Sequence, residues 1–220
     1  MLIDPIEELY KTKENNYFSL EREIFKNAIK QKGIRILDIG CGTGALGAFF
    51  RKEQQCEVYG IDINKNACLE AEKNIDHVLH ANVETIDLPY ESDYFDVVVM
   101  GDVLEHLLNP VIAIHKILGV LKPGGHIYIT VPNVRHWQTT RDLVFKDKWE
   151  YASWGTLDYT HLRFFTRTSI IKMFSEAGIN VIKTEWVIKR PSKSSRINTF
   201  SFGLFAGFLA SHTFLVVKKE

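Results

Sequence analysis

The sequence predicts a doubly wound α/β fold: a mostly parallel, seven-stranded sheet with helices on both faces and an antiparallel final strand. Two observations carry this prediction. Short apolar segments, such as 96–100, alternate with segments of helical periodicity through much of the chain. Two further strand-like segments joined by a long loop close the chain, and such a pair is typical of an antiparallel end.

The elements follow one another within a single domain that spans residues 1–220. A helical leader over 1–33 ends at Gly33. The expected strands are 34–39, 57–62, 77–81, 96–100, 126–131, 180–188 and 212–217. The expected helices are 45–53, 64–74, 109–121 and 168–177. Because right-handed crossovers bring the carboxyl ends of parallel strands to one edge, a ligand is expected there.

Composition narrows the class of protein. Lys and Arg together number 27, as do Asp and Glu, so the net charge of zero argues against broad nucleic-acid binding. The three cysteines show no metal-ligand spacing and fit a reducing compartment, and the first residues lack the pattern of a signal peptide. We therefore expect a cytoplasmic protein that does not bind nucleic acid broadly. No feature indicates an oligomeric state.

An apolar stretch over 200–217 approaches the length of a membrane span, about 18 residues or more. Ser201, Ser211, His212 and Thr213 interrupt it, so no stable span is expected. We predict a core-covering loop or short helix over 200–210, followed by a buried strand. The alternative is peripheral contact of 200–210 with a membrane or a lipid-linked substrate.

A glycine-rich turn follows the first strand and organises the candidate site. Gly42 opens a G-x-G-x-x-G pattern, and Asp62 lies 20 residues further on at a strand end, which matches a dinucleotide fingerprint. Asp38, before the turn, instead favours a cationic amino group and disfavours a pyrophosphate. The turn therefore admits a nicotinamide dinucleotide, as in an NAD(P)-dependent oxidoreductase, or S-adenosylmethionine.

The segment 37–44, Leu-Asp-Ile-Gly-Cys-Gly-Thr-Gly, resembles the first motif of class I S-adenosylmethionine-dependent methyltransferases. Further segments resemble that family in its order and spacing: 60–63, 88–89, 94–98, 104–107 and 121–125. The nearest branch resembles O-methyltransferases of ubiquinone biosynthesis and methyltransferases of glycan and natural-product pathways. The resemblance implies a Rossmann-like fold, S-adenosylmethionine as cofactor and S-adenosylhomocysteine as product.

The same resemblance implies roles around the cofactor. Asp38 and Gly40 would hold the methionine end, while Gly42 and Gly44 allow close approach and Cys41 is a small residue that fits the turn. Asp62 would accept the ribose hydroxyls. The remaining expected cofactor residues are Ile63 on the adenine, Asn82 with the backbone of Val83 at the adenine amino group, and Gly101 with Asp102 at the methyl end. Asn82 departs from the family, which often has Asp there.

The acceptor side is expected in 132–166, an aromatic- and arginine-rich insertion without clear periodicity that would cover the substrate. His161 is the first candidate for a general base and Asp158 would orient it; His106 is the second. The alternative is that both histidines only order their loops. Arg135, Tyr159 and Arg163 are candidate substrate ligands, although loop salt bridging would also explain the arginines.

The histidines are scattered along the sequence, so no metal site is expected. The family resemblance, together with the arginine- and aromatic-rich insertion, implies an O-methyltransferase acting on a small molecule such as a sugar, a glycan precursor or a related metabolite. A non-catalytic S-adenosylmethionine-binding protein stays open as a further alternative.

Overall fold

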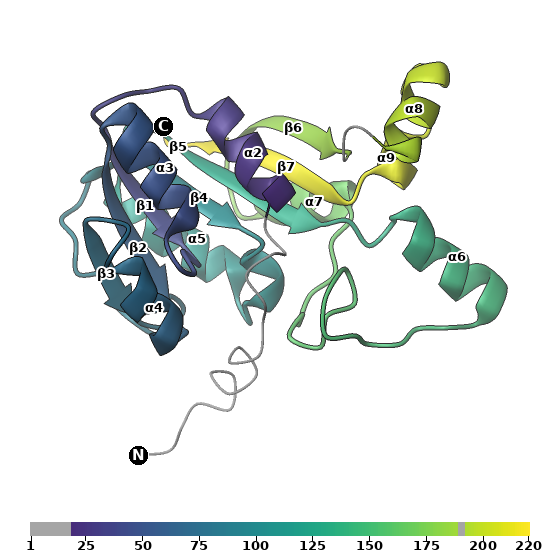
Figure 1. Ribbon diagram of the computed structural model, residues 1–220, viewed down its shortest axis with the longest axis horizontal. Coiled ribbons are helices and arrows are strands. Elements are labelled where there is room, and N and C mark those ends of the chain that lie inside the picture. Colours follow the sequence, from purple (N-terminus) through teal and green to yellow (C-terminus); the bar gives the residue numbers. More distant parts are fainter. Residues whose placement is uncertain (1–18, 189–191) are drawn as a thin grey trace, which may run out of the picture.

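The computed structural model describes residues 19–188 and 192–220, which form a seven-stranded mixed sheet with helices on both faces (Figure 1). The strand order is β3-β2-β1-β4-β5-β7-β6. β7 pairs antiparallel with both β5 and β6, whereas the other pairings are parallel. The bounds are β1 Arg35–Ile39, β2 Glu57–Asp62, β3 His77–His80, β4 Phe95–Gly101, β5 Leu121–Pro132, β6 Val181–Val187 and β7 His212–Lys218. The predicted fold class is confirmed, including the antiparallel final strand.

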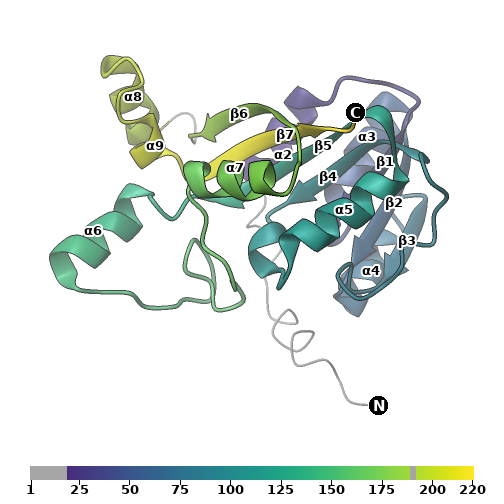
Figure 2. The ribbon, with the colours of Figure 1, turned by 180° about the vertical axis from the view of Figure 1, so that it is seen from behind.

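The helices divide between the two faces of the sheet. α2, α3 and α4 cover one face (Figure 1), and α5 and α7 cover the other (Figure 2). Their bounds are α2 Ser19–Ala28, α3 Ala45–Gln54, α4 Lys65–Ala71, α5 Pro110–Val120 and α7 Arg167–Glu176. The Asn64 side chain caps α4 by accepting from the N–H groups of Asn66 and Ala67. Residues 1–18 of the predicted leader lie outside the described residues.

Strand β4 shows why the sheet needs cover on both sides. Val97 and Val99 pack in the cluster that contains Phe25 of α2 and Phe50 of α3. Val98 and Met100, which point to the opposite face, pack in the cluster that contains residues of α5 and α7. All four side chains are buried. A strand that is buried on both faces has a continuous run of apolar residues, which explains the apolar residues 97–100.

Within 132–166, where the sequence shows no clear periodicity, Trp137–Lys146 form helix α6. No residue of α6 is buried, so packing against the core does not stabilise this helix. Local contacts support it instead. Arg141 lies over the Trp137 ring at 5.1 Å, and Lys146 pairs with Asp142 one turn earlier at 2.8 Å.

The expectation that 200–210 covers the core is wrong for most of its aromatic side chains. The segment forms the end of α8 (Lys193–Phe200), a turn and the short helix α9 (Ala206–Leu209). Phe200, Phe202 and Leu204 are 85%, 99% and 80% exposed, and only Leu209 and Ala210 are buried. Figures 1 and 2 show α8 and α9 beyond the β6–β7 end of the sheet. No helix among the described residues is long and apolar enough to cross a membrane.

Candidate active site

The glycine turn lies at the carboxyl edge of the sheet, between the ends of two other strands. β1 pairs with β2 on one side and β4 on the other. The N–H groups of Gly40 and Cys41 both donate to the carbonyl of Ile61, at 2.7 and 3.2 Å. Gly40, Gly42 and Gly44 have φ angles of 73°, 53° and 75°, which disfavour any residue with a Cβ. The turn is therefore fixed against β2 and presents backbone to the edge of the sheet.

Asp62, at the end of β2, connects this turn to the next helix. One carboxylate oxygen accepts from the Gly42 N–H at 2.8 Å, and the other accepts from the Asn64 N–H at 2.7 Å. Burial raises the pKa of Asp62, while these N–H donors oppose the rise. Each oxygen retains a further lone pair, so the carboxylate can still accept from a ribose diol.

Cys41 serves packing in this turn. Its Sγ is buried against Gly60, where an added Cβ would lie 2.6 Å from the sulfur. Burial, followed by the nearby Asp38 and Asp62, raises the pKa of the Cys41 thiol. A thiol held in its neutral form is a poor nucleophile. This agrees with the predicted role of a small residue that fits the turn.

The other expected cofactor residues surround the same edge. Asp38 is buried in β1, in register with Gly60 and Val99 of the neighbouring strands. The Ile63 carbonyl lies 2.9 Å from Nε2 of His80. The Asn82 side-chain oxygen accepts from the Glu84 N–H at 2.9 Å, and Val83 is buried. The side-chain oxygen of Asn82 thus stabilises the loop after β3, in addition to any contact with an adenine.

The end of β4 meets the glycine turn directly. A Cβ on Gly40 would lie 2.7 Å from Cγ2 of Val103, so the turn and the segment after β4 are in close contact. Gly101 lies under the Phe25 ring, and Asp102 has a φ of 54°. One Asp102 oxygen accepts from the Thr130 hydroxyl at 3.0 Å.

Asp102 also faces β7. Its second carboxylate oxygen lies 3.5 Å from Nε2 of His212, and both side chains are buried. Asp102 therefore connects β4 to β5 and β7, a structural role that its predicted place at the methyl end did not include.

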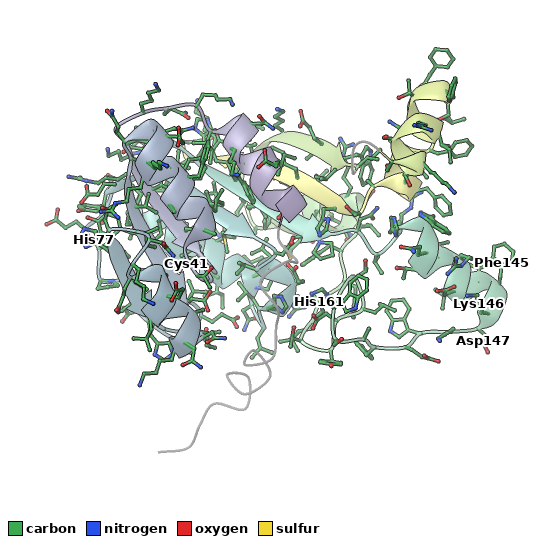
Figure 3. The ribbon with its side chains drawn as sticks, in the orientation of Figure 1. Cys41, His77, Phe145, Lys146, Asp147 and His161 are labelled. Atoms are coloured by element: carbon green, nitrogen blue, oxygen red, sulfur yellow. The ribbon has the colours of Figure 1, made fainter. Side chains whose placement is uncertain are left out.

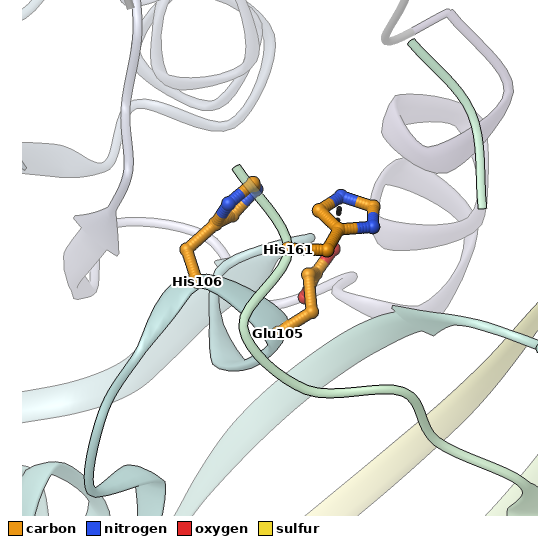
Figure 4. Close-up of side chains that lie close together, drawn as sticks. All are labelled: Glu105, His106 and His161. Carbon is orange, nitrogen blue, oxygen red and sulfur yellow. Dashed lines mark ion pairs between the residues drawn. The ribbon is translucent and has the colours of Figure 1, made fainter. Parts of the chain in front are cut away.

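Three side chains gather just beyond Val103 (Figure 4). Glu105 and His106 belong to the short 3₁₀ helix η1 (Leu104–His106), and His161 comes from the 132–166 insertion. One potential ligand atom from each lies within 4.8 Å of the others, and Nε2 of His161 is 3.9 Å from a Glu105 carboxylate oxygen. Glu105 is 1% exposed and His161 is 6% exposed. We call this group the Glu105–His106–His161 cluster.

Main-chain hydrogen bonds hold the insertion against η1. The N–H groups of Leu162 and Arg163 donate to the Glu105 carbonyl at 2.8 and 3.0 Å. Nδ1 of His161 lies 3.0 Å from the Thr156 carbonyl, and Nδ1 of His106 lies 3.0 Å from the Thr160 carbonyl. At Nδ1 of His161, the Thr156 carbonyl takes the orienting position that we expected of Asp158. The Asp158 carboxylate accepts from the N–H and hydroxyl of Thr160.

Arg135, Tyr159 and Arg163, the three predicted substrate ligands, do not line a common pocket among the described residues. Arg163 donates from Nε to the Leu107 carbonyl at 3.2 Å and from a terminal nitrogen to the Leu108 carbonyl. Tyr159 is about half exposed. Arg135 lines a hollow between α7 and β6 together with Arg167 and Trp186. Figure 3 shows His161 near the sheet and the α6 end, at Phe145 to Asp147, far out on the insertion.

Sequence reasoning missed Glu105 and His212. The pair Glu105-His106 directly after a predicted central strand was the available signal for the first, because that position faces the ligand edge. His212 opens the final strand, and its approach to Asp102 depends on the pairing of β7 with β5, for which the sequence carries no local sign.

Comparisons with known proteins identify the family. Residues 13–184 match the model of the methyltransferase domain. The chain is 29% identical over 208 residues to an uncharacterized protein of Methanocaldococcus jannaschii, which covers 91% of this chain and 94% of that protein. It is 36% identical over 110 residues to the ubiquinone biosynthesis O-methyltransferase of Alkalilimnicola ehrlichii; this match covers 46% of the chain and less than half, 43%, of that relative.

The fold has close counterparts among solved structures. An S-adenosylmethionine-dependent methyltransferase from Archaeoglobus fulgidus superposes with a TM-score of 0.69 at 18% identity, over 91% of this chain and 93% of that one. The family match decides between the two interpretations of the glycine turn, in favour of S-adenosylmethionine over a dinucleotide. The chain belongs to the methyltransferase domain family, and it is a class I S-adenosylmethionine-dependent methyltransferase.

Proposed function

We propose that this enzyme transfers the methyl group of S-adenosylmethionine to a hydroxyl oxygen of a small molecule. The observation that carries the proposal is the position of the Glu105–His106–His161 cluster. It follows β4 at the carboxyl edge, two residues beyond the Val103 side chain that touches the glycine turn. The donor residues, Asp38, Gly40 and Asp62, and the acceptor-side residues therefore lie on the same edge of the sheet.

Methyl transfer is an in-line displacement, so holding the acceptor oxygen about 3 Å from the methyl group supplies much of the rate. A hydroxyl acceptor must also lose its proton. His161 is our candidate to act on that proton, because Nδ1 faces a carbonyl and Nε2 faces Glu105. The insertion 132–166, which carries His161, would cover the acceptor.

Three further observations bear on the acceptor class. The ubiquinone biosynthesis O-methyltransferase named above supports an aromatic hydroxyl, and Arg135 beside Arg167 supports an anionic group such as the phosphate of a sugar nucleotide or glycan precursor. The exposed Phe200, Phe202 and Leu204 support an acceptor that carries an apolar chain, or contact with a lipid surface. These acceptors are all small molecules with a hydroxyl group.

The test is release of S-adenosylhomocysteine from the full chain with a panel of acceptors. The panel contains phenols with and without a prenyl chain, sugar nucleotides, and matched methyl ethers in which the hydroxyl is already blocked. We expect turnover with one hydroxyl class and none with its methyl ether. Turnover that persists with the blocked ether, or that occurs only with amine or carbon acceptors, would contradict oxygen methylation.

Substitution of the candidate base gives an independent test. His161→Ala should lower turnover at least about 100-fold, the scale of general acid–base catalysis, while the affinity for S-adenosylmethionine measured by calorimetry stays within about twofold. His115→Ala, an exposed histidine on α5, is the matched control and should behave as wild type. Unchanged turnover in His161→Ala would remove His161 from the mechanism.

A further inference from the structure

We infer that the Glu105–His106–His161 cluster binds a divalent cation. Two imidazoles and one carboxylate converge here, with one potential ligand atom of each within 4.8 Å of the others. Figure 4 shows that the ligands come from two separate segments, η1 and the insertion, which meet only in the folded chain. The histidines are far apart along the chain, so no metal site was expected from the sequence.

The hydrogen bonds of the two histidines select the nitrogen that binds a metal. A carbonyl oxygen can only accept, so Nδ1 of His161 donates to Thr156 and Nδ1 of His106 donates to Thr160. With the proton on Nδ1, the Nε2 atom of each neutral ring carries a lone pair. Metal-binding histidines in proteins are typically oriented in this way, by a carbonyl or carboxylate behind the ring.

The cluster is also held together by the backbone. Leu162 and Arg163 both donate N–H groups to the Glu105 carbonyl, so the residue after His161 is hydrogen-bonded to a ligand-bearing residue of η1. Arg163 reinforces the contact through the carbonyls of Leu107 and Leu108. The two segments therefore cannot separate without breaking several hydrogen bonds, and the three ligands are preorganised.

Distance and charge fit a cation once the three side chains move inward. Tetrahedral ligands about 2.1 Å from a cation lie about 3.4 Å apart. Nε2 of His161 and the Glu105 carboxylate are 3.9 Å apart, and all three ligand atoms lie within 4.8 Å of one another, so rotation about side-chain bonds must bring them closer when a cation binds. A carboxylate that is 1% exposed, with two imidazoles beside it, offers one negative charge in surroundings of low dielectric, where a divalent cation is strongly attracted.

The ligand chemistry specifies the class of cation. Imidazole nitrogens suit Zn²⁺, Fe²⁺ and similar transition-series cations, whereas Mg²⁺, Ca²⁺ and Mn²⁺ prefer sites built from oxygen. Three protein ligands leave at least one position open for an outside oxygen. Binding of the cation is independent of the proposed function; only the catalytic role that follows rests on it.

In that role, the acceptor hydroxyl occupies the open position and the cation lowers its pKa. The O–H bond breaks and the proton passes to solvent water. The oxygen then forms a bond to the methyl carbon, and the carbon–sulfur bond breaks with its electron pair left on sulfur. His161 would then act on the acceptor through the cation.

The experiment uses the full chain after dialysis against a chelator. Binding of Zn²⁺, Mn²⁺, Co²⁺ and Mg²⁺ is measured by calorimetry, and the bound metal is counted by elemental analysis. We expect one equivalent of a transition-series cation and weaker binding of Mg²⁺. Bound Co²⁺ provides a visible absorption spectrum that reports nitrogen ligation without any need for turnover.

Variants assign the site. His106→Ala and His161→Ala should each weaken cation binding by more than the 10- to 100-fold that loss of an outer-shell partner costs, about 100-fold or more, whereas His115→Ala should bind as wild type. Glu105→Gln is measured alongside, with circular dichroism to confirm folding of every variant. Equal binding by wild type and His161→Ala, or no cation bound by wild type, overturns the proposal and leaves a His161–Glu105 ion pair only.

The same samples separate this inference from the proposed function. If S-adenosylmethionine binds and methyl transfer proceeds equally well with and without cation, the catalytic role of the metal is wrong and oxygen methylation stands. If the cation binds with the expected variant pattern but no hydroxyl acceptor is methylated, the metal site stands and the proposed function is wrong.

Discussion

The Gly42 N–H donates to the Asp62 carboxylate at 2.8 Å, so the turn after β1 and the end of β2 are joined by the residue expected to bind the ribose. Hydrogen bonds to charged groups contribute about 1.5–3 kcal/mol each. A change at Asp62 therefore alters both the shape of the turn and the direct contact with the cofactor.

Asp62→Ala should weaken S-adenosylmethionine binding by at least about 10-fold, measured by calorimetry, because one charged acceptor is lost. Asp76 is a matched control, since its carboxylate also accepts a backbone N–H, from Val58 at 2.9 Å, at the opposite end of β2. Asp76→Ala should lower stability without changing cofactor affinity. Equal losses of affinity in both variants would mean that Asp62 acts only through stability.

Gly40→Ala should lower the free energy of unfolding by about 1–2 kcal/mol from its left-handed φ alone, and further from contact with Val103. The added Cβ would lie 2.7 Å from Cγ2 of Val103. Val103→Ala should therefore recover part of the loss in the double variant, measured by urea unfolding. Strict additivity of the two changes would show that the contact carries no energy.

Asp96 should contribute to stability above pH 4 and lose that contribution in acid. Burial alone would raise the pKa of Asp96, but Lys122 and the Arg35 N–H outweigh it and hold the pKa below its usual value. The contribution is thus complete above the unfolded pKa of about 3.9 and disappears as pH falls through the lower folded pKa.

Asp96→Asn should cost under about 1 kcal/mol at pH 7, because the pair is partly exposed, and the difference from wild type should vanish in acid. Urea unfolding from pH 7 down to about pH 2 measures this, because the loss lies below the lowered folded pKa of Asp96, and the exposed Asp87→Asn is the control. A difference that stays constant across the range would contradict the assignment.

Two phenylalanines near the chain end should respond in opposite ways to the same substitution. Phe214 is fully buried against Phe25 and Tyr128, so Phe214→Ala should cost about 3–5 kcal/mol. Phe202 is 99% exposed, so Phe202→Ala should change the free energy of unfolding by less than about 0.5 kcal/mol. A large loss in Phe202→Ala would restore the core-covering role that the sequence suggested.

The parts of the fold that the sequence predicts are those with a local signature. Strand β4 is apolar because both of its faces are covered, and the turn after β1 needs glycine at three positive φ angles. The Asn64 cap is a local contact as well. Helix α6 escapes prediction because it buries no side chain and is supported by charge and ring contacts on its own surface.

In the candidate site, too, some residues have a local signature in the sequence and others do not. The expected donor residues lie within the recognisable motif and at the next strand end, so the motif and the family resemblance together predict them. The acceptor-side cluster depends on main-chain bonds between the Glu105 carbonyl and the 162–163 amides, and amides are common to every residue except proline. Glu105 therefore appears as a possible metal ligand only after the two segments are seen together.

The attachment of the insertion to η1 through main-chain atoms has a consequence for divergence within this family. The side chains of residues 147–154 are exposed, so they can be replaced without removing the main-chain bonds that hold His161 beside Glu105. If the insertion covers the acceptor as proposed, selection can alter which compound is accepted while the reacting groups keep their relative positions. The attachment would then separate the choice of acceptor from the chemistry performed on it.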